Sequence, residues 1–385
     1  LSKAFHTLDH NILLFKLDYH GIKNTKYNWF KSYLSQQTQI VKIHGTLSSP
    51  LPMQTGVPHG SILGPLLFIR YMNYICESSN LFDFVLYADD TTLSAPLGTF
   101  IYNPQHRNQI PVNINSELNK IYQWLSTNKL SLNIEKTKFM VFHFNQKRID
   151  KSKIPHLEIN GIPIKQVHDF NFLGLTISDT LSWHAHIEKI SIKISRTLGI
   201  MNRLKHIVNS DILRLLYNSL ILSHINFSLL SWGSNTSRIF KLQKKAVRII
   251  TKSKYNSHTE PLFQSLNLLK ISDLYQLKLL KFYYNYCNNK LPSYFKDLFI
   301  RNADVHSHIT RQTDQLHTPA AKHVTVEQGI RYALPPIVNK TQPCILEKIE
   351  SHSYQGFSLY IKRHVISNYN FVCNNRECYV CNSNS

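Results

Sequence analysis

The stretch FDFVLYADDTTLSAP, residues 82–96, places two adjacent aspartates, Asp89 and Asp90, between two apolar runs. The runs at 81–87 and 91–95 contain β-branched and aromatic residues, so the sequence predicts two strands joined by a tight turn. A hairpin of this kind would hold both carboxylates at its tip, near the end of a buried sheet.

Two carboxylates at one turn have two explanations. Adjacent carboxylates repel each other, and a divalent cation relieves that repulsion. Two Mg²⁺ ions about 3.5–4 Å apart can clamp the attacking and leaving oxygens of a phosphoryl transfer. Aspartates are also common in solvated turns that have no chemical role. Taken alone, the tetrapeptide Tyr87-Ala88-Asp89-Asp90 favours the plain turn.

A glycine-rich stretch, GVPHGSILGPLLF at residues 56–68, precedes the hairpin. Its glycines allow the backbone to approach a ligand closely. The apolar segment at 61–75 has Pro65 near its start, where a helix tolerates proline best. The alternative is a plain loop that leads into a core helix, and the glycine and proline content does not exclude it.

The other predicted elements divide the chain into a mixed part and a helical part. Before residue 181 the sequence predicts helices at 27–34 and 114–130 and strands at 38–44, 138–144 and 170–177. After it, five apolar residues share one helical face: Ile187, Ile190, Ile194, Leu198 and Met201. Further helices are predicted at 212–222, 238–251, 272–287 and 354–366, and the prolines beyond residue 302 predict an irregular region. His184 and His186 are interpreted as surface residues.

The charge of the chain points to a polyanionic partner. Lysine and arginine exceed aspartate and glutamate by 44 − 23 = 21, and the isoelectric point is about 9.6. The segment 189–254 holds thirteen lysines and arginines and one acid, Asp211. Neutralised phosphates release counterions and add affinity, so this clustering favours nucleic acid over a basic surface that serves only solubility.

The remaining composition indicates an intracellular protein. The six cysteines do not form the pattern of a secreted disulfide framework. No apolar run reaches the roughly twenty residues of a membrane span, and no leader peptide is visible at Leu1. We expect a protein of the nucleus and cytoplasm that does not act at a membrane.

Five motifs, in chain order, resemble those of LINE-type (non-long-terminal-repeat, jockey-like) reverse transcriptases. They are LSKAFHTLDH at 1–10, the stretch at 56–68, YADD at 87–90, LNIEKTK at 132–138, and FLGL at 172–175 followed by Trp183 and His186-Ile187. Residues 216–217, 232–233, 242–248 and 310–311 are also similar to the carboxyl-terminal half of the family. Each motif is a weak signal alone, and together in this order they are a strong one.

The resemblance implies an α+β fold of the right-hand polymerase type. It implies a palm at 1–180, with an antiparallel sheet and packed helices but without the fingers. A basic helical thumb at 181–300 and an irregular, cysteine-containing region at 301–385 would follow. The implied activity is RNA-directed DNA polymerisation by nucleotidyl transfer with Mg²⁺, on an RNA template with a DNA primer and deoxynucleoside triphosphates. An endonuclease domain is expected upstream in the full-length element.

The resemblance also assigns roles to individual residues. Asp89 and Asp90 would be the catalytic ligands of Mg²⁺. The fifth motif would be the primer-grip strand and the entry to the thumb. The implied nucleotide-binding residues are Phe5, which would pack under the sugar and reject a 2′-hydroxyl, and His59, Tyr87 and Lys136. The implied nucleic-acid-binding residues are Lys241, Lys244, Lys245 and Arg248, which would grip phosphates without reading sequence.

Several positions depart from the family pattern. In the family, the residue before Leu1 is the first catalytic aspartate, so the two-metal site is expected to be incomplete and residues 1–385 inactive in DNA synthesis. Asp9 lies too far along the chain to replace it. His6, His59 and Tyr74 stand where the family usually has aspartate, glutamine and an acid. A fragment, a gene model and a decayed copy all remain open, and the alternative function is a non-catalytic nucleic-acid-binding remnant.

The three cysteines near the end, Cys373, Cys378 and Cys381, have a spacing close to that of zinc ligands, with His364 as a fourth candidate. The spacing is imperfect for such a site. Reduced thiols without metal are the favoured interpretation, and a zinc site is the alternative.

Overall fold

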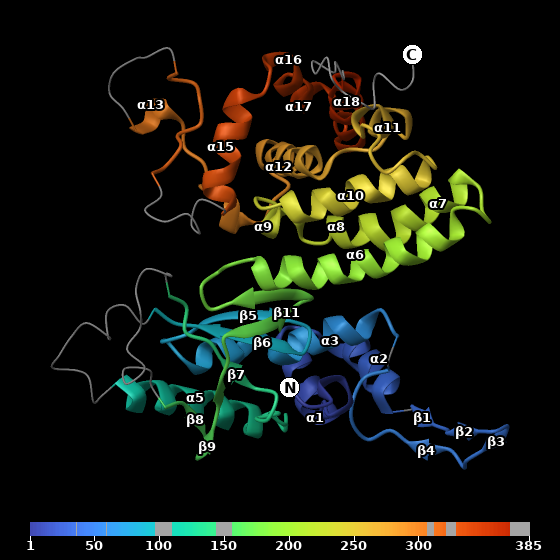
Figure 1. Ribbon diagram of the computed structural model, residues 1–385. Coiled ribbons are helices and arrows are strands. Elements are labelled where there is room, and N and C mark those ends of the chain that lie inside the picture. Colours follow the sequence, from blue (N-terminus) through green and yellow to red (C-terminus); the bar gives the residue numbers. More distant parts are fainter. Residues whose placement is uncertain are drawn as a thin grey trace, which may run out of the picture. The chain divides into compact units, whose positions relative to one another are not determined.

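A computed structural model describes residues 1–35, 37–58, 60–96, 110–143, 156–305, 312–320 and 329–369. The chain forms two compact units. Unit 1 comprises Leu1–Val141 and Lys147–His168, and unit 2 comprises Phe142–Gln146 and Asp169–Ser385 (Figure 1). The division after His168 leaves the segment at 169–180 with the helical part, although the sequence prediction had grouped it with the palm. Palm and thumb remain predicted names for these parts.

Unit 1 combines helices with small sheets. Its helices are η1 (Ala4–His6), α1 (His10–Tyr19), α2 (Asn24–Ser35), α3 (Leu63–Met72), η2 (Asn73–Ser78) and α5 (Ile110–Thr127). Its strands are β1 (Thr38–Gln39), β2 (Lys42–Ile43), β3 (Thr46–Leu47), β4 (Leu51–Pro52), β5 (Asp83–Tyr87), β6 (Asp90–Ser94), β7 (Lys138–Phe139), β8 (Glu158–Ile159), β9 (Ile162–Pro163) and β10 (Lys165–Gln166). Each described strand pairs with one other strand, so the sheets of the described residues are two-stranded.

Helix α1 contributes three buried leucines to the core of unit 1. The Asp9 carboxylate accepts hydrogen bonds from the backbone N–H groups of Asn11 and Ile12, at 2.9 and 3.0 Å, and so caps the first turn. Gly21, with φ +82°, ends the helix in the left-handed conformation that glycine adopts without strain. Between these ends, Leu13, Leu14 and Leu17 are buried in a cluster that also contains residues of α3 and α5.

Residues 38–52 form a ribbon instead of the single strand predicted at 38–44. Strand β1 pairs with β4 and β2 pairs with β3, both antiparallel, and in Figure 1 the ribbon extends away from the helices of unit 1. Ile40, Val41 and Ile43 are exposed. No second apolar layer of the described residues covers these side chains, so the alternating pattern of the ribbon does not produce a buried face.

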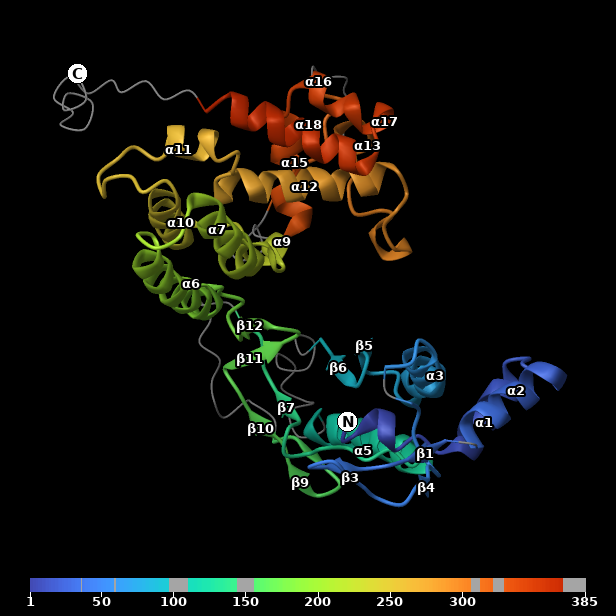
Figure 2. The ribbon, with the colours of Figure 1, turned by 90° about the vertical axis from the view of Figure 1, so that its right-hand side faces the viewer.

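Unit 2 is mainly helical. It begins with the hairpin β11 (Asp169–Phe172) and β12 (Leu175–Ser178). Its first helices are α6 (His184–Leu204), α7 (Ser210–Leu216), the π-helix η5 (Tyr217–Leu222), α8 (Ser223–Asn226), α9 (Leu229–Trp232), α10 (Ser237–Ile250), α11 (Glu260–Ser265) and α12 (Ile271–Cys287). The later ones are η6 (Ser293–Phe295), α13 (Asn302–Val305), α15 (Ile330–Lys340), α16 (Pro343–Leu346), α17 (Lys348–Ser351) and α18 (Tyr354–Ser367), shown from a second side in Figure 2.

The predicted apolar face of α6 is confirmed, because all five of its residues are buried in the core of unit 2. The prediction of an irregular region beyond residue 302 is wrong for much of its length. Helix α15 contains Pro335 and Pro336, which remove two backbone donors. Leu334, Pro335 and Val338 are nevertheless buried in the core, and this apolar packing outweighs the weak helical propensity. Among the described residues, no helix is long and apolar enough to cross a membrane.

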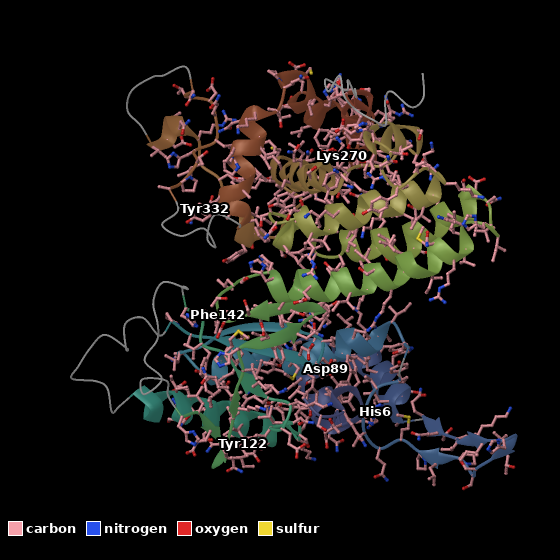
Figure 3. The ribbon with its side chains drawn as sticks, in the orientation of Figure 1. His6, Asp89, Tyr122, Phe142, Lys270 and Tyr332 are labelled. Carbon is pink, nitrogen blue, oxygen red and sulfur yellow. The ribbon has the colours of Figure 1, made fainter. Side chains whose placement is uncertain are left out.

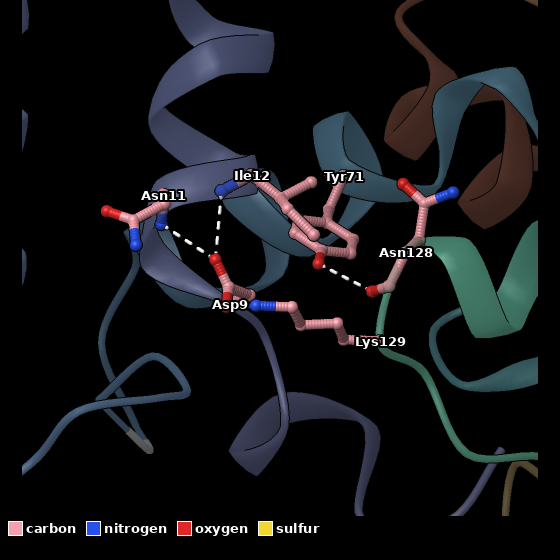
Figure 4. Close-up of polar contacts among 6 residues, drawn as sticks. All are labelled: Asp9, Asn11, Ile12, Tyr71, Asn128 and Lys129. Carbon is pink, nitrogen blue, oxygen red and sulfur yellow. Dashed lines mark hydrogen bonds and ion pairs between the residues drawn. The ribbon is translucent and has the colours of Figure 1, made fainter.

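Lys16 of α1 connects distant parts of unit 1. Its Nζ donates hydrogen bonds to the Tyr71 carbonyl and to Asn128 Oδ1, both at 2.6 Å. The Tyr71 hydroxyl donates to the Asn128 carbonyl at 2.7 Å (Figure 4). Burial lowers the pKa of Lys16 to about 8 and raises that of Tyr71 to about 12. At neutral pH Lys16 is therefore still charged in the folded protein, although its burial makes that charge energetically unfavourable.

Lys16→Met is expected to abolish a rise in stability at alkaline pH. An unfolded lysine keeps its proton up to about pH 10.5, whereas the folded one releases it above about pH 8. The unfolded state then binds more protons, so the free energy of unfolding of the wild type should rise with pH in this window. Urea denaturation of both proteins at about pH 7.5 and about pH 9.5 measures the effect. A difference between the two proteins that does not change with pH would contradict it.

Candidate functional site

The two aspartates lie at the tip of a hairpin, as predicted. Strands β5 and β6 are antiparallel, with Tyr87 paired to Asp90, so Ala88 and Asp89 form the turn. Ala88 has φ 50°, the left-handed conformation required by a tight two-residue turn. Asp89 (Figure 3) and Asp90 are both exposed. The turn therefore offers two neighbouring carboxylates to solvent.

The hairpin is less buried than the sequence predicts. Val85 is 53% exposed and Tyr87 is 63% exposed. Only Phe84 of β5 is even half-buried, because no third described strand pairs with this sheet. The expected buried sheet behind the aspartates is thus wrong for the described residues.

The beginning of the chain lies beside the hairpin tip. The α-amino group of Leu1 donates a hydrogen bond to the Asp89 carbonyl oxygen at 3.3 Å. The backbone N–H of Ser2 donates to the Ser131 carbonyl at 2.8 Å, which fixes the direction of this segment. A residue preceding Leu1 would therefore adjoin the turn that carries the two aspartates.

Backbone hydrogen bonds join the first motif to the glycine-rich stretch. Val57 N–H donates to the Phe5 carbonyl at 2.9 Å, and Gly56 N–H donates to the Leu8 carbonyl at 2.7 Å. His10 Nε2 donates to the Gly56 carbonyl at 2.7 Å. Gly56 has φ +86°, and a Cβ there would lie 2.8–2.9 Å from backbone atoms of Phe5 and His6. The two motifs contact each other so closely that only glycine fits.

The predicted nucleotide-binding residues differ in their burial and in their contacts. Phe5 is half-buried and stacks on Phe68 of α3, with ring centroids 4.6 Å apart. Tyr87 is exposed next to the turn. Lys136 is exposed, and its backbone N–H donates to Asn133 Oδ1 at 3.0 Å, a local contact that does not join it to the hairpin. His59 lies outside the described residues.

Asp9 and Lys129 form a contact that the sequence did not predict. Lys129 Nζ lies 2.6 Å from Asp9 Oδ2 (Figure 4), and this hydrogen bond holds the pKa of Asp9 below its usual range. The pair joins the cap of α1 to the turn after α5. The pattern Asp9-His10-Asn11-Ile12 signals a helix cap, but the sequence contains no sign of its basic partner. Asp9 is therefore a structural residue.

Six basic residues of unit 2 line a groove between α6 and α10. Its volume is about 820 Å³. The four residues predicted to bind nucleic acid, Lys241, Lys244, Lys245 and Arg248, all line it. Arg196 of α6 and Arg238 of α10, which the sequence analysis did not single out, line it too. Residues on one helix at spacings of three and four share a face, and Arg196 meets that face from the neighbouring helix.

The candidate metal ligands are the two aspartates of the turn and the predicted zinc ligands. Within the described residues, no group of three or more histidines, cysteines, aspartates or glutamates gathers to hold a metal ion. The pair Asp89 and Asp90 still suits Mg²⁺, which proteins commonly bind through one or two carboxylates together with substrate phosphates. Of the predicted zinc ligands, His364 stacks on Tyr360 at 6.3 Å between ring centroids. Cys373, Cys378 and Cys381 lie outside the described residues.

The sequence of residues 1–177 matches the family model described as reverse transcriptase (RNA-dependent DNA polymerase). Residues 1–177 thus carry a reverse transcriptase domain. The YADD hairpin and the glycine-rich stretch both fall within the matched part, and the resemblance to the LINE-type members is confirmed.

Three proteins of Drosophila melanogaster are similar to this chain. The probable RNA-directed DNA polymerase from transposon BS is 26% identical to it over 275 residues. This match covers 68% of the chain and 28% of that protein. The RNA-directed DNA polymerase from mobile element jockey is 23% identical over 307 residues, a match that covers 74% of the chain and 32% of that protein. The probable RNA-directed DNA polymerase from transposon X-element is 21% identical over 255 residues, covering 63% and 27%. The chain thus spans about a third or less of these relatives.

Proposed function

We propose that this chain carries the palm and thumb of an RNA-directed DNA polymerase. The observation that carries the proposal is the turn with Asp89 and Asp90 beside Leu1, inside the part that matches the reverse transcriptase family. The substrates would be an RNA template, a DNA primer and deoxynucleoside triphosphates. The test is DNA synthesis on a primed RNA template, with Asp89→Asn as the diagnostic variant.

In this proposal the two carboxylates hold Mg²⁺ at the hairpin tip. Asp89 and Asp90 would hold the ion, which when bound would neutralise charge on the triphosphate and favour attack by the primer hydroxyl. Phe5, held by its stacking on Phe68, would lie under the sugar of the incoming nucleotide and exclude a 2′-hydroxyl. The backbone bonds between Phe5 and Val57 keep that ring in place.

A third carboxylate is needed to complete a two-metal site. Two Mg²⁺ ions carry four positive charges, and Asp89 and Asp90 offset two of them. In the family the first catalytic aspartate stands directly before the residue that corresponds to Leu1. The hydrogen bond from Leu1 to the Asp89 carbonyl supports this arrangement, because that position adjoins the turn.

The groove between α6 and α10 supports a second candidate function, nucleic-acid binding without catalysis. Six basic side chains line it, and Ser195 adds a hydroxyl group. Such a surface suits the sugar–phosphate backbone, which needs positive charge and donors but no base contacts. In this second candidate function the protein binds the primed template but does not use a metal site. An upstream endonuclease, a nuclear and cytoplasmic location and a zinc site remain predictions.

Replacing Lys241, Lys244 and Lys245 together by glutamine is expected to weaken binding of a primed RNA–DNA hybrid. Each phosphate contact contributes roughly 0.7–0.9 to the slope of log affinity against log salt, so losing three contacts should reduce that slope by about 2–3. Fluorescence anisotropy between about 50 and 200 mM salt measures both quantities.

The matched control replaces Lys290, Lys296 and Lys340 by glutamine. These lysines are exposed in the same unit, and none of them lines the groove. The control changes the net charge by the same amount. Equal losses of affinity and slope in the two triple variants would show that only net charge matters and that the groove is not the binding site.

A further inference from the structure

His186 is buried in the first turn of α6, although the sequence analysis placed it on the surface. It is 2% exposed. The backbone N–H of Thr176 in β12 donates a hydrogen bond to its Nδ1 at 3.2 Å. Because Nδ1 accepts, the proton of the neutral ring is on Nε2. Nε2 is buried and has no hydrogen-bond partner among the described residues.

The His186 ring packs against a tryptophan that fixes the other end of the same hairpin. The centroid of Trp232 lies 5.7 Å from that of His186. Trp232 Nε1 donates to the Phe227 carbonyl at 2.9 Å. The Phe227 ring in turn lies against Gly174, where an added Cβ would be 3.1 Å from two ring carbons. The β11–β12 hairpin is therefore held at its turn by Phe227 and at its second strand by His186.

We propose that His186 is a positioning residue that locks the β11–β12 hairpin onto the helices of unit 2. The proposal rests on the proposed polymerase function, in which this hairpin is the primer grip. Three groups of separate elements meet at the ring: the Thr176 amide, the Trp183 ring and the Trp232 ring. A hairpin fixed at both its turn and its second strand can hold a primer terminus in one place.

The lock requires a neutral imidazole. A protonated ring carries hydrogens on both nitrogens and cannot accept from Thr176. Burial, with further contributions from Lys189 and Lys193 of the same helix, lowers the pKa of His186 below its usual 6.5. Strand β12 contacts the ring through an uncharged amide, and α9 contacts it through the uncharged Trp232. The hydrogen bond from Thr176 to His186 therefore forms at neutral pH, and its contribution to stability decreases as the pH falls below about 6.5.

The experiment compares His186→Asn with His186→Leu in the full chain. The Asn side-chain oxygen is as many bonds from the backbone as Nδ1 and can accept from Thr176, whereas leucine leaves that amide without an acceptor. Hydrogen exchange of the β12 amides at pH 7 should be about tenfold faster in His186→Leu and close to wild type in His186→Asn. Unchanged exchange in His186→Leu, or equally fast exchange in both variants, would overturn the lock.

A pH series serves as a second measurement if His186→Leu does not fold. Relative to the amides of α12, those of β12 should lose protection in the wild type as the pH falls from about 7 to about 5, and should not do so in His186→Asn. Equal pH dependence in both proteins would overturn the role of the imidazole.

Primer extension separates positioning from folding. For the chain extended by an upstream fingers segment that ends in aspartate directly before Leu1, His186→Leu should raise the KM for primed template several-fold. The KM for nucleotide should stay unchanged, and His186→Asn should restore the wild-type value. An unchanged KM for primed template would overturn the positioning role. Absence of synthesis by the parent protein would count against the polymerase function, and the exchange data would still decide whether the lock exists.

Discussion

DNA synthesis on a primed RNA template is expected only when an aspartate precedes Leu1 and Asp89 is intact. The polypeptide of residues 1–385 alone should give no measurable extension, because Asp89 and Asp90 supply two of the charges that a two-metal site needs. Adding an upstream fingers segment that ends in aspartate should give activity. Asp89→Asn should then reduce it on the order of 10³-fold, the scale seen when one group that stabilises transition-state charge is lost. Extension of a labelled primer measures these rates.

Asp83→Asn is the matched control for this experiment. Asp83 is exposed at the far end of the same strand, opposite Ser94, and its replacement changes the charge of the hairpin by the same amount. It should leave the rate close to that of the parent. Robust, Asp89-dependent synthesis by residues 1–385 alone would contradict the requirement for the preceding carboxylate.

Gly56→Ala is expected to lower the free energy of unfolding of unit 1 by about 3 kcal/mol. The backbone at Gly56 has φ +86°, which strains any other residue. The added Cβ would also meet backbone atoms of Phe5 and His6 at 2.8–2.9 Å, which cannot move aside as a flexible side chain could. The hydrogen bonds between the first motif and the glycine-rich stretch would have to break. Urea denaturation, followed by tryptophan fluorescence to which Trp29 and Trp124 of unit 1 contribute, measures the loss.

Gly21→Ala isolates the strain from the steric conflict. Gly21 has a similar φ of +82°, and nothing lies within 4 Å of its hypothetical Cβ. Its replacement should cost about 1 kcal/mol, the penalty of the left-handed conformation alone. Equal losses at the two positions would show that the close approach of Phe5 and His6 is unimportant.

The parts of the fold that the sequence predicted are those determined locally. The YADD hairpin follows from two β-type runs on either side of a turn, and the buried face of α6 follows from the spacing of its apolar residues. Both signals lie within one element. The residues of α10 that line the groove could be predicted in the same way, because they lie on one helix.

The parts that the sequence did not predict depend on distant partners. His186 is buried only because β12 and α9 pack against it, and Asp9 contacts a lysine 120 residues away. The exposure of β5 depends on how many strands join its sheet, which no property of β5 itself reveals. Helix α15 forms despite Pro335 and Pro336 because its face is buried in the core, a tertiary effect that propensity alone cannot anticipate.

The contact between Lys16 and Asn128 also has a consequence for synthesis on the ribosome. The two residues are 112 positions apart in the chain. At about 5–20 residues per second, translation needs ~6–20 s to proceed from one to the other. During that interval α1 can pack against α2 and α3, which are already made, but not against α5. The hydrogen bond that joins Lys16 to the end of α5 therefore forms only after most of unit 1 has been synthesised.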